Sequence, residues 1–120
     1  MTNEEYEIKL REVSVEVDLK AAELTEKLKV KIHPFSFFSG DKFVIGYMKE
    51  PNRLDKMRAI DLFDASRTQA GDYLLRTSLI HEESDKDILD ENPKNDTIYL
   101  GAISFAIQIL QISTEQLKKK

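Results

Sequence analysis

The chain has 120 residues, of which 41% are hydrophobic and 33% are charged, and its formal net charge is −4 at pH 7. A chain of this length forms one domain with a sizeable core, and its acidic balance argues against nucleic-acid binding, which needs clustered Lys and Arg. The absence of cysteine excludes disulfides, thiolate zinc sites and a cysteine nucleophile.

No targeting or membrane signal is evident. The first residues, MTNEEYEIK, are polar and acidic, unlike those of a signal peptide. The longest mostly apolar stretch, Ile98–Ile112, contains Gly101, Gln108 and Gln111 and is shorter than the roughly 20 residues that cross a bilayer. We therefore expect a soluble, cytoplasmic protein with no membrane and no nucleic-acid partner.

Residues 3–28 carry two competing patterns. Val13, Val15, Val17 and Leu19 alternate with polar residues, as in a strand. A longer set recurs at spacings of three and four, as on one helical face: Tyr6, Leu10, Val13, Val17, Ala21, Leu24 and Leu28. The longer pattern, the capping-box spacing of Thr2 and Glu5 and the AAELTEKL ending favour a helix.

Residues 30–49 predict a β-hairpin, because a Ser39-Gly40-Asp41 turn separates two apolar and aromatic runs. Pro34 cannot donate a backbone hydrogen bond, so the first strand lies at an edge or is shortened to Phe35–Phe38. The two faces of the second strand would carry Phe43, Ile45 and Tyr47 on one side and Val44, Gly46 and Met48 on the other.

Residues 52–118 are predicted to be mainly helical. Asn52 can cap a first helix, with apolar positions 54, 57 and 60/61 turned inward and Arg53, Asp55, Lys56 and Arg58 left outside. Ser66 can cap a second helix that runs to about residue 80.

An acidic segment, Glu82–Asp96, follows these helices and contains Pro93, so it should be a loop. Asp96 or Thr97 then starts a last helix that is apolar on most sides, so we expect it to be central and the most buried element. Taken together, residues 1–120 predict a single, mainly helical α+β domain in which a small antiparallel β-hairpin packs against three to four helices.

No catalytic, metal or cofactor site emerges. Asp85-x-Asp87 begins like an EF-hand loop, but Leu89 and Asp90 stand where a ligand and a glycine are required. Two histidines, His33 and His81, form no ligand-spaced pair, and no serine or glycine lies in a nucleophile or phosphate-loop motif. We therefore expect no enzyme activity, no metal and no cofactor.

Aromatic residues concentrate around the hairpin. They allow two interpretations, a sheet face packed on helices or a docking surface for another protein. The last helix allows the same two, since self-association or a helical partner would cover what a small domain leaves exposed. As partner-binding candidates the sequence offers Phe35, Phe37, Phe38, Tyr47 and Tyr73.

From Tyr47 onward the order of elements resembles a family of small phage and prophage tail assembly chaperones, over roughly residues 43–118. That family has an apolar strand, a basic-Pro-x-Arg step, two helices, an acidic loop and an apolar helix that ends in lysines. The step here is YMKEPNR, at positions 47–53, with Glu50 inserted before the proline. Residues 77–80 lack the family's Cys and Trp, His81-Glu82 replaces a Gly-Gly pair, and the acidic loop is longer.

The resemblance implies a non-enzymatic phage protein that binds the long, apolar, helical tape-measure protein in the host cytoplasm, keeps it soluble and recruits tail-tube subunits. The alternative is a minor virion component of the capsid, cargo or tail, whose surfaces make permanent symmetric contacts, including with its own copies. A small regulator or an enzyme of unrecognised type is the third hypothesis.

Overall fold

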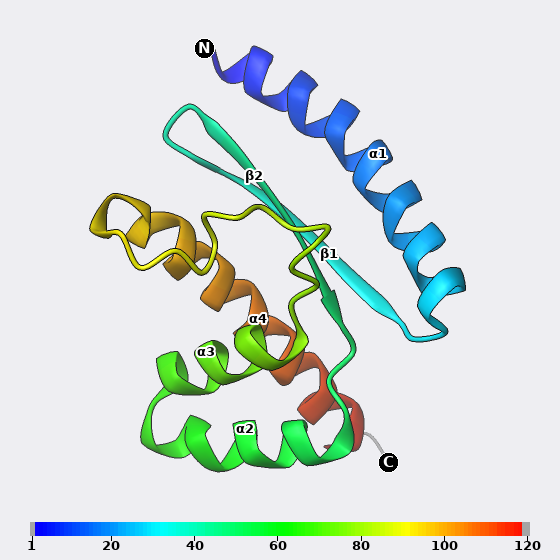
Figure 1. The fold of residues 1–120 in the computed structure, drawn as a ribbon, viewed down its shortest axis with the longest axis vertical. Coiled ribbons are helices and arrows are strands. Elements are labelled where there is room, and N and C mark those ends of the chain that lie inside the picture. Colours follow the sequence, from blue (N-terminus) through cyan, green and yellow to red (C-terminus); the bar gives the residue numbers. More distant parts are fainter. Residues whose placement is uncertain (1, 119–120) are drawn as a thin grey trace.

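A computed structural model describes residues 2–118 and confirms the predicted α+β class. Within that range four helices accompany one two-stranded antiparallel sheet (Figure 1). The elements are α1 (Asn3–Leu28), β1 (Ile32–Ser39), β2 (Lys42–Lys49), α2 (Arg53–Ala65), α3 (Arg67–Ser78), a short 3₁₀ helix η1 (Pro93–Asn95) and α4 (Asp96–Lys118).

The hairpin lies between two helical layers. Helix α1 runs along one side of it, and α2, α3 and α4 lie on the other side (Figure 1). Val44 and Met48 of β2 join a large cluster with α3 and α4, whereas Tyr47 joins a smaller cluster with α1. The predicted division of β2 into two faces is therefore confirmed, and both faces are covered.

Helix α1 begins as its sequence predicts. Thr2 accepts a hydrogen bond from the backbone N–H of Glu5, and the Glu5 carboxylate accepts one from the backbone N–H of Thr2. Its inner face buries Val17, Ala21 and Leu24 against the hairpin. The helix ends at Leu28, and the next residue, Lys29, has the left-handed backbone conformation that commonly terminates a helix.

The hairpin turn consists of Gly40 and Asp41, and Gly40 has the positive φ of 63° that such a turn requires. Pro34 lies inside β1, opposite Tyr47. The backbone N–H of Glu50 donates to the carbonyl of Lys31, so ladder bonds fall on residues 31, 33 and 35 and pass over Pro34. The proline therefore leaves β1 at full length, as an edge strand.

Residues 79–85, which lead from α3 into the acidic segment, cover the outer edge of β2. Leu79 forms a bridge to Met48, and the N–H of Ile80 donates to the carbonyl of Tyr47 over 2.8 Å. The N–H of Tyr47 donates to Ser84 Oγ over 2.9 Å, and the N–H of Asp85 donates to the carbonyl of Ile45 over 2.9 Å. A strand edge that would otherwise present unpaired backbone groups is thus satisfied by a loop.

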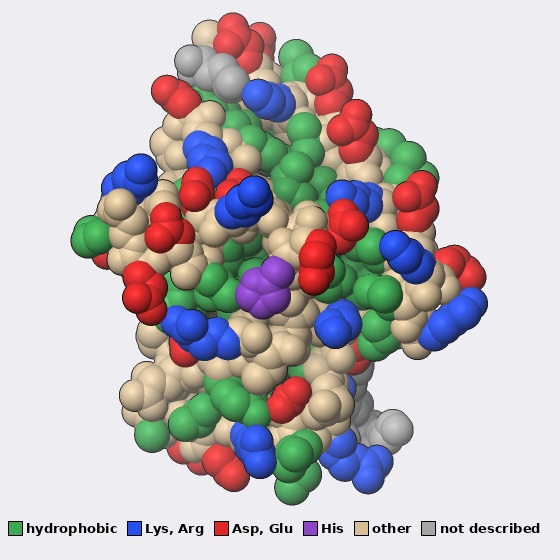
Figure 2. Space-filling model, in the orientation of Figure 1, with side chains coloured by type: hydrophobic (Ala, Val, Ile, Leu, Met, Phe, Trp, Pro, Cys, Tyr) green, Lys and Arg blue, Asp and Glu red, His purple; other side chains and the backbone are tan. Residues whose placement is uncertain are grey.

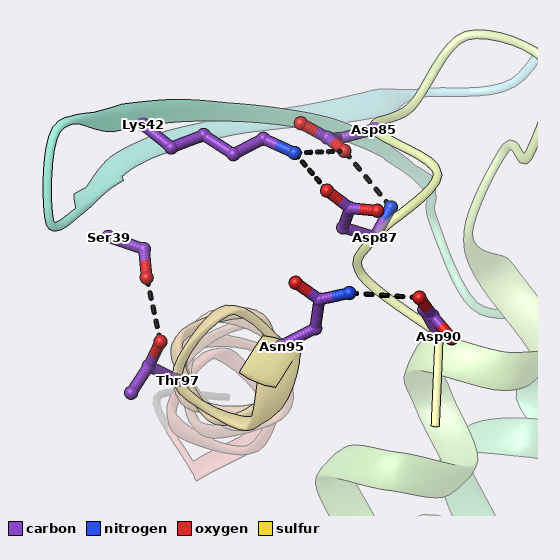
Figure 3. Close-up of polar contacts among 7 residues, drawn as sticks. All are labelled: Ser39, Lys42, Asp85, Asp87, Asp90, Asn95 and Thr97. Carbon is purple, nitrogen blue, oxygen red and sulfur yellow. Dashed lines mark hydrogen bonds and ion pairs between the residues drawn. The ribbon is translucent and has the colours of Figure 1, made fainter. Parts of the chain in front are cut away.

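Acidic side chains hold this loop in place. Lys42 Nζ of β2 pairs with Asp85 at 3.2 Å and also with Asp87 (Figure 3). Further along, Asp90 accepts a hydrogen bond from the Asn95 side chain over 2.9 Å, just before α4. The carboxylates that invite a calcium hypothesis are therefore used in local structure.

Helix α4 contributes more residues to the large cluster than any other element. Its contact with α3 is close, because Gly71 of α3 lies against Ile103 of α4. The side chains that α4 buries are Ile98, Ala102, Ile103, Ala106, Ile109 and Leu110. Leu100 and Ile112 are exposed and Phe105 is half-buried, so the helix is central but one side of it faces solvent.

The predicted orientation of α2 is wrong. Leu54, Met57 and Ile60 are exposed, whereas Ala59 is fully buried. Leu62 and Phe63 pack against the large cluster beside it. Asn52 caps α2 and Ser66 caps α3, as predicted. The small Ala59 lets α2 approach its neighbours closely, which turns the larger apolar residues of the first turns outward.

The close approach of α3 and α4 predicts that Gly71→Ala destabilises the fold. A Cβ at position 71 would lie 2.8 Å from Ile103 Cγ2 and 3.0 Å from the Ile103 carbonyl oxygen. The crowding should cost about 1–3 kcal/mol and outweigh a helix-propensity gain of about 1 kcal/mol. Urea denaturation measures the free energy of unfolding, with the exposed change Thr68→Ala in the same helix as control. Equal or greater stability of Gly71→Ala would contradict the packing described.

The loop cover of β2 predicts that Ser84→Ala also destabilises the chain. Ser84 is buried and its Oγ accepts from the N–H of Tyr47, which would lose its partner. An unsatisfied buried donor should cost about 1–3 kcal/mol. Ser104→Ala, on the exposed side of α4, serves as the matched control in the same denaturation experiment. Equal free energies of unfolding for the two variants would contradict the structural role given to this loop.

Candidate functional site

The structure places two of the five aromatic candidates in the interior. Phe35 is only 5% exposed and Tyr47 only 3% exposed. The Phe35 ring lies against Gly46, where an added Cβ would come within 2.1 Å of it. Burial also raises the pKa of Tyr47. As a correction to the sequence-based hypothesis, Phe35 and Tyr47 are core residues and offer no exposed contact to a partner.

Phe37 and Phe38 are half-buried on opposite faces of β1. Phe37 packs against the large cluster, and its ring occupies the space beside Gly101 of α4. Phe38 makes edge-on ring contacts with Tyr6 at 4.6 Å and with Phe43 at 4.8 Å between centroids. Both rings therefore join the hairpin to a helix, on one side through α4 and on the other through α1.

Tyr73 fastens α3 to α2. Its hydroxyl donates to Asp55 Oδ1 over 2.8 Å, and Arg58 donates to the same hydroxyl over 3.5 Å. This contact explains why Asp55, predicted to lie outside, is turned toward α3. A partner-binding role for Phe37, Phe38 and Tyr73 stays a prediction, since each already has an intramolecular packing role.

Helix α2 presents an apolar stripe to solvent that the aromatic hypothesis missed. We call Leu54, Met57 and Ile60 the α2 outer stripe; their side chains are 55%, 57% and 39% exposed. Hydrophobic side chains gather at this end of the molecule, over α2 (Figure 2). Their spacing of three residues places them along one helical face. The exposed charges beside them have both signs, with Arg53, Arg58, Asp61 and Asp64.

Helix α1 carries a second stripe, opposite its buried face. We call Ile8, Val15 and Leu19 the α1 outer stripe; their side chains are 56%, 61% and 61% exposed. This stripe explains the two competing patterns in the sequence, because an apolar residue on either side of a helix can imitate the alternation of a strand. The alternation of Val13, Val15, Val17 and Leu19 therefore reflects a helix with apolar residues on two opposite sides, one buried and one exposed.

An open groove of about 460 Å³ lies between the C-terminal ends of α1 and α3 and the strand β2. Leu24, Leu28 and Leu79 line it, with Lys49, Arg76 and His81 also present. Both helices place their C-terminal ends here, and cations favourably oppose the negative end of a helix dipole. Glu82 and Glu83 also line the groove, so its charges have both signs, and its lining residues present no nucleophile beside a base.

The described side chains, those of residues 2–112, form no candidate metal centre, and no buried polar atom among them lacks a hydrogen-bond partner. His33 lies 3.3 Å from Glu50 in a half-buried pair. No helix in the described part of the chain is long and apolar enough to cross a membrane. Comparison with family models, curated proteins and solved structures finds no match to this chain.

The ion pair between α1 and the acidic segment predicts a pH dependence of stability. Lys20 Nζ pairs with Glu83 and lies 5.4 Å from the centre of the Tyr47 ring. The hydrogen bond from Lys20 lowers the pKa of Glu83. A carboxyl group whose pKa is lower in the folded state than in the unfolded state stabilises the folded state at pH values above its unfolded pKa. This contribution is lost as the pH falls through the lowered pKa.

Lys20→Met should therefore reduce stability at pH 7, and its difference from the wild-type protein should shrink as the pH falls below about 4. Urea midpoints measured between pH 7 and pH 3 test this expectation. Lys9→Met, at an exposed position of the same helix, is the control. A difference that stays constant across the range would show that Lys20 acts through packing on Tyr47 and not through its charge.

Proposed function

We propose that this chain is a non-enzymatic protein-binding factor of phage tail assembly, similar in role to a tail assembly chaperone, that binds the tape-measure protein in the host cytoplasm. The observation that supports the proposal is the α2 outer stripe, Leu54, Met57 and Ile60. It lies within residues 43–118, the segment whose order of elements resembles the chaperone family.

The α2 outer stripe is suited to another helix. Residues spaced by three on one helical face can pack into the groove of an amphipathic or apolar partner helix. Met57 at its centre has a flexible, polarizable side chain that adapts to different contacts. Because charges of both signs surround the stripe, charge repulsion would exclude few partner helices. This weak selectivity suits a partner that consists of a long succession of apolar helical segments.

The size of the stripe fits a transient contact. Burying the exposed half of three such side chains gives about 3 kcal/mol of hydrophobic stabilisation, from about 1.5–3 kcal/mol for each fully buried side chain. Association costs at least about 4 kcal/mol through lost rotational and translational freedom, which is more than this gain, so a stable complex needs contacts beyond the stripe. A single contact would therefore be weak, and a long partner would be held by many copies that each leave readily.

A virion component is the second candidate, favoured by the exposure of Leu100 and Ile112 on α4 in addition to the α2 outer stripe. Permanent symmetric contacts could cover these side chains in an assembled particle. The two candidates differ in where the chain is found after assembly. A chaperone is absent from purified particles, whereas a virion component is present in them at a fixed copy number.

Co-expression with the tape-measure protein of the same phage tests the proposal. The chain should raise the soluble fraction of that protein, and Met57→Glu should reduce the effect by about tenfold, because a carboxylate would be buried against an apolar helix. Met57→Leu should retain the effect, and Thr68→Glu on α3 is the matched control for added charge. Equal activity of Met57→Glu and the wild-type chain would refute this use of α2.

A further inference from the structure

We infer that the α1 outer stripe is a second docking surface, and that its occupant is an amphipathic helix of another protein whose apolar seam is flanked by Lys and Arg. The inference is independent of the proposed function. Helix α1 packs on the hairpin face opposite to the one that α2, α3 and α4 cover, so the two outer stripes belong to different sides of the molecule (Figure 1).

The geometry is that of one side of a coiled coil. Positions 8, 12, 15, 19, 22 and 26 follow alternating steps of four and three, the spacing of a heptad seam. Ile8, Val15 and Leu19 occupy three of these positions and are more than half exposed. Single exposed apolar residues are normal on protein surfaces, but Val15 and Leu19 are neighbours on one seam, and Ile8 lies further along the same seam beyond Glu12.

The helix is held firmly for such a contact. Its opposite side buries Val17, Ala21 and Leu24 against the hairpin, and Tyr6 packs on Phe38 near the hairpin turn. Lys20 adds an ion pair to Glu83 on the acidic segment. The outer stripe is thus presented on a pre-formed helix, so a partner need not order it on binding.

Charge selects the occupant. Helix α1 contains eight acidic and four basic residues, a net charge of 8 − 4 = 4 negative, equal to that of the whole chain. Along one side of the stripe lie Glu5, Glu16 and Glu23, and along the other side lie Glu4, Arg11 and Asp18. The seam itself includes Glu12 and Glu26, so the neighbours of the stripe are mainly acidic. Acidic side chains alternate with hydrophobic ones along α1 (Figure 2).

Two of these carboxylates are free to pair with a partner. Glu12 and Glu16 are exposed and make no ion pair with any residue of the described range. Lys or Arg of a partner would pair with Glu16 beside the seam, at one of the e and g positions that set partner choice in coiled coils, and with Glu12 within the seam. A second copy of this chain paired antiparallel would bring the glutamate side against itself, and an anionic lipid or nucleic-acid surface would be repelled.

Three synthetic helical peptides of three heptads, about 21 residues each, test the proposal. The first peptide has a Leu/Ile seam with Lys and Arg beside it. The second has the same seam with Glu in place of Lys and Arg. The third keeps the Lys and Arg but has Ser in place of the Leu/Ile seam. Fluorescence anisotropy should show that the full chain binds the first peptide at least about tenfold more tightly than either of the others. The peptide should perturb the amide signals of residues 8–22 in an NMR spectrum of the labelled chain.

Variants separate the apolar and charged contributions. Val15→Gln/Leu19→Gln should weaken the first peptide by about tenfold or more, because it removes the apolar line without touching the buried face. Glu12→Lys/Glu16→Lys should weaken the first peptide and strengthen the second. Leu100→Gln, at a comparably exposed leucine on α4, should bind as the wild-type chain does, and circular dichroism should confirm that every variant is folded.

Three outcomes would overturn the inference. Equal binding of the first and third peptides would mean that the chain attracts cations without using the apolar stripe. Perturbed signals on α2 in place of α1 would move the site to the other face. A dimer in sedimentation equilibrium that Val15→Gln/Leu19→Gln dissociates would assign the stripe to a second copy of the chain. The first and third outcomes do not involve the α2 outer stripe, and the second would show peptide binding there without testing tape-measure binding. The co-expression experiment therefore tests the proposed function separately.

Discussion

The structure depends on covering every free surface of strand β2. A two-stranded hairpin is marginally stable in water, so β2 needs contacts beyond its partner β1. On one face of β2, Val44 and Met48 pack against the large cluster, and on the other face Tyr47 packs against the small cluster. The outer edge of β2 is hydrogen-bonded to Ile80 and Ser84 of the segment after α3. Each helix owes its place to one of these contacts, made either with the strand or with a helix already packed on it.

This arrangement uses only one side of most helices. Helix α1 forms a whole layer by itself, so its buried residues lie on one face and nothing in the described range covers the other. Helix α2 lies at the margin of the opposite layer and contributes only Ala59 as a fully buried residue. The apolar residues on the outer faces of α1 and α2 add nothing to this core. A function that needs them explains their presence better than stability does.

Local signals allowed most of the fold to be predicted from the sequence. The Thr2–Glu5 capping box, the caps at Asn52 and Ser66 and the Gly40 turn are set by neighbouring residues, and each is present in the structure. Tertiary packing decided the rest. Periodicity assigns the larger apolar residues to the interior, but α2 buries its small Ala59 and exposes Met57, and no pattern of hydrophobicity alone distinguishes these two orientations. The same limit applied to the aromatics, since only the fold could show that Phe35 and Tyr47 are interior.

The two outer stripes differ most in charge, and that difference gives them different selectivity. A stripe surrounded by both signs of charge, like that of α2, discriminates weakly among apolar helices. Mainly acidic surroundings, as around the α1 outer stripe, disfavour an acidic helix and favour a basic one by like-charge repulsion and ion pairing. Because the stripes reach the hairpin through separate clusters, substitutions on one should leave binding at the other nearly unchanged. Under the two proposals, the chain would hold two helices of different composition at once, one on each side of the hairpin.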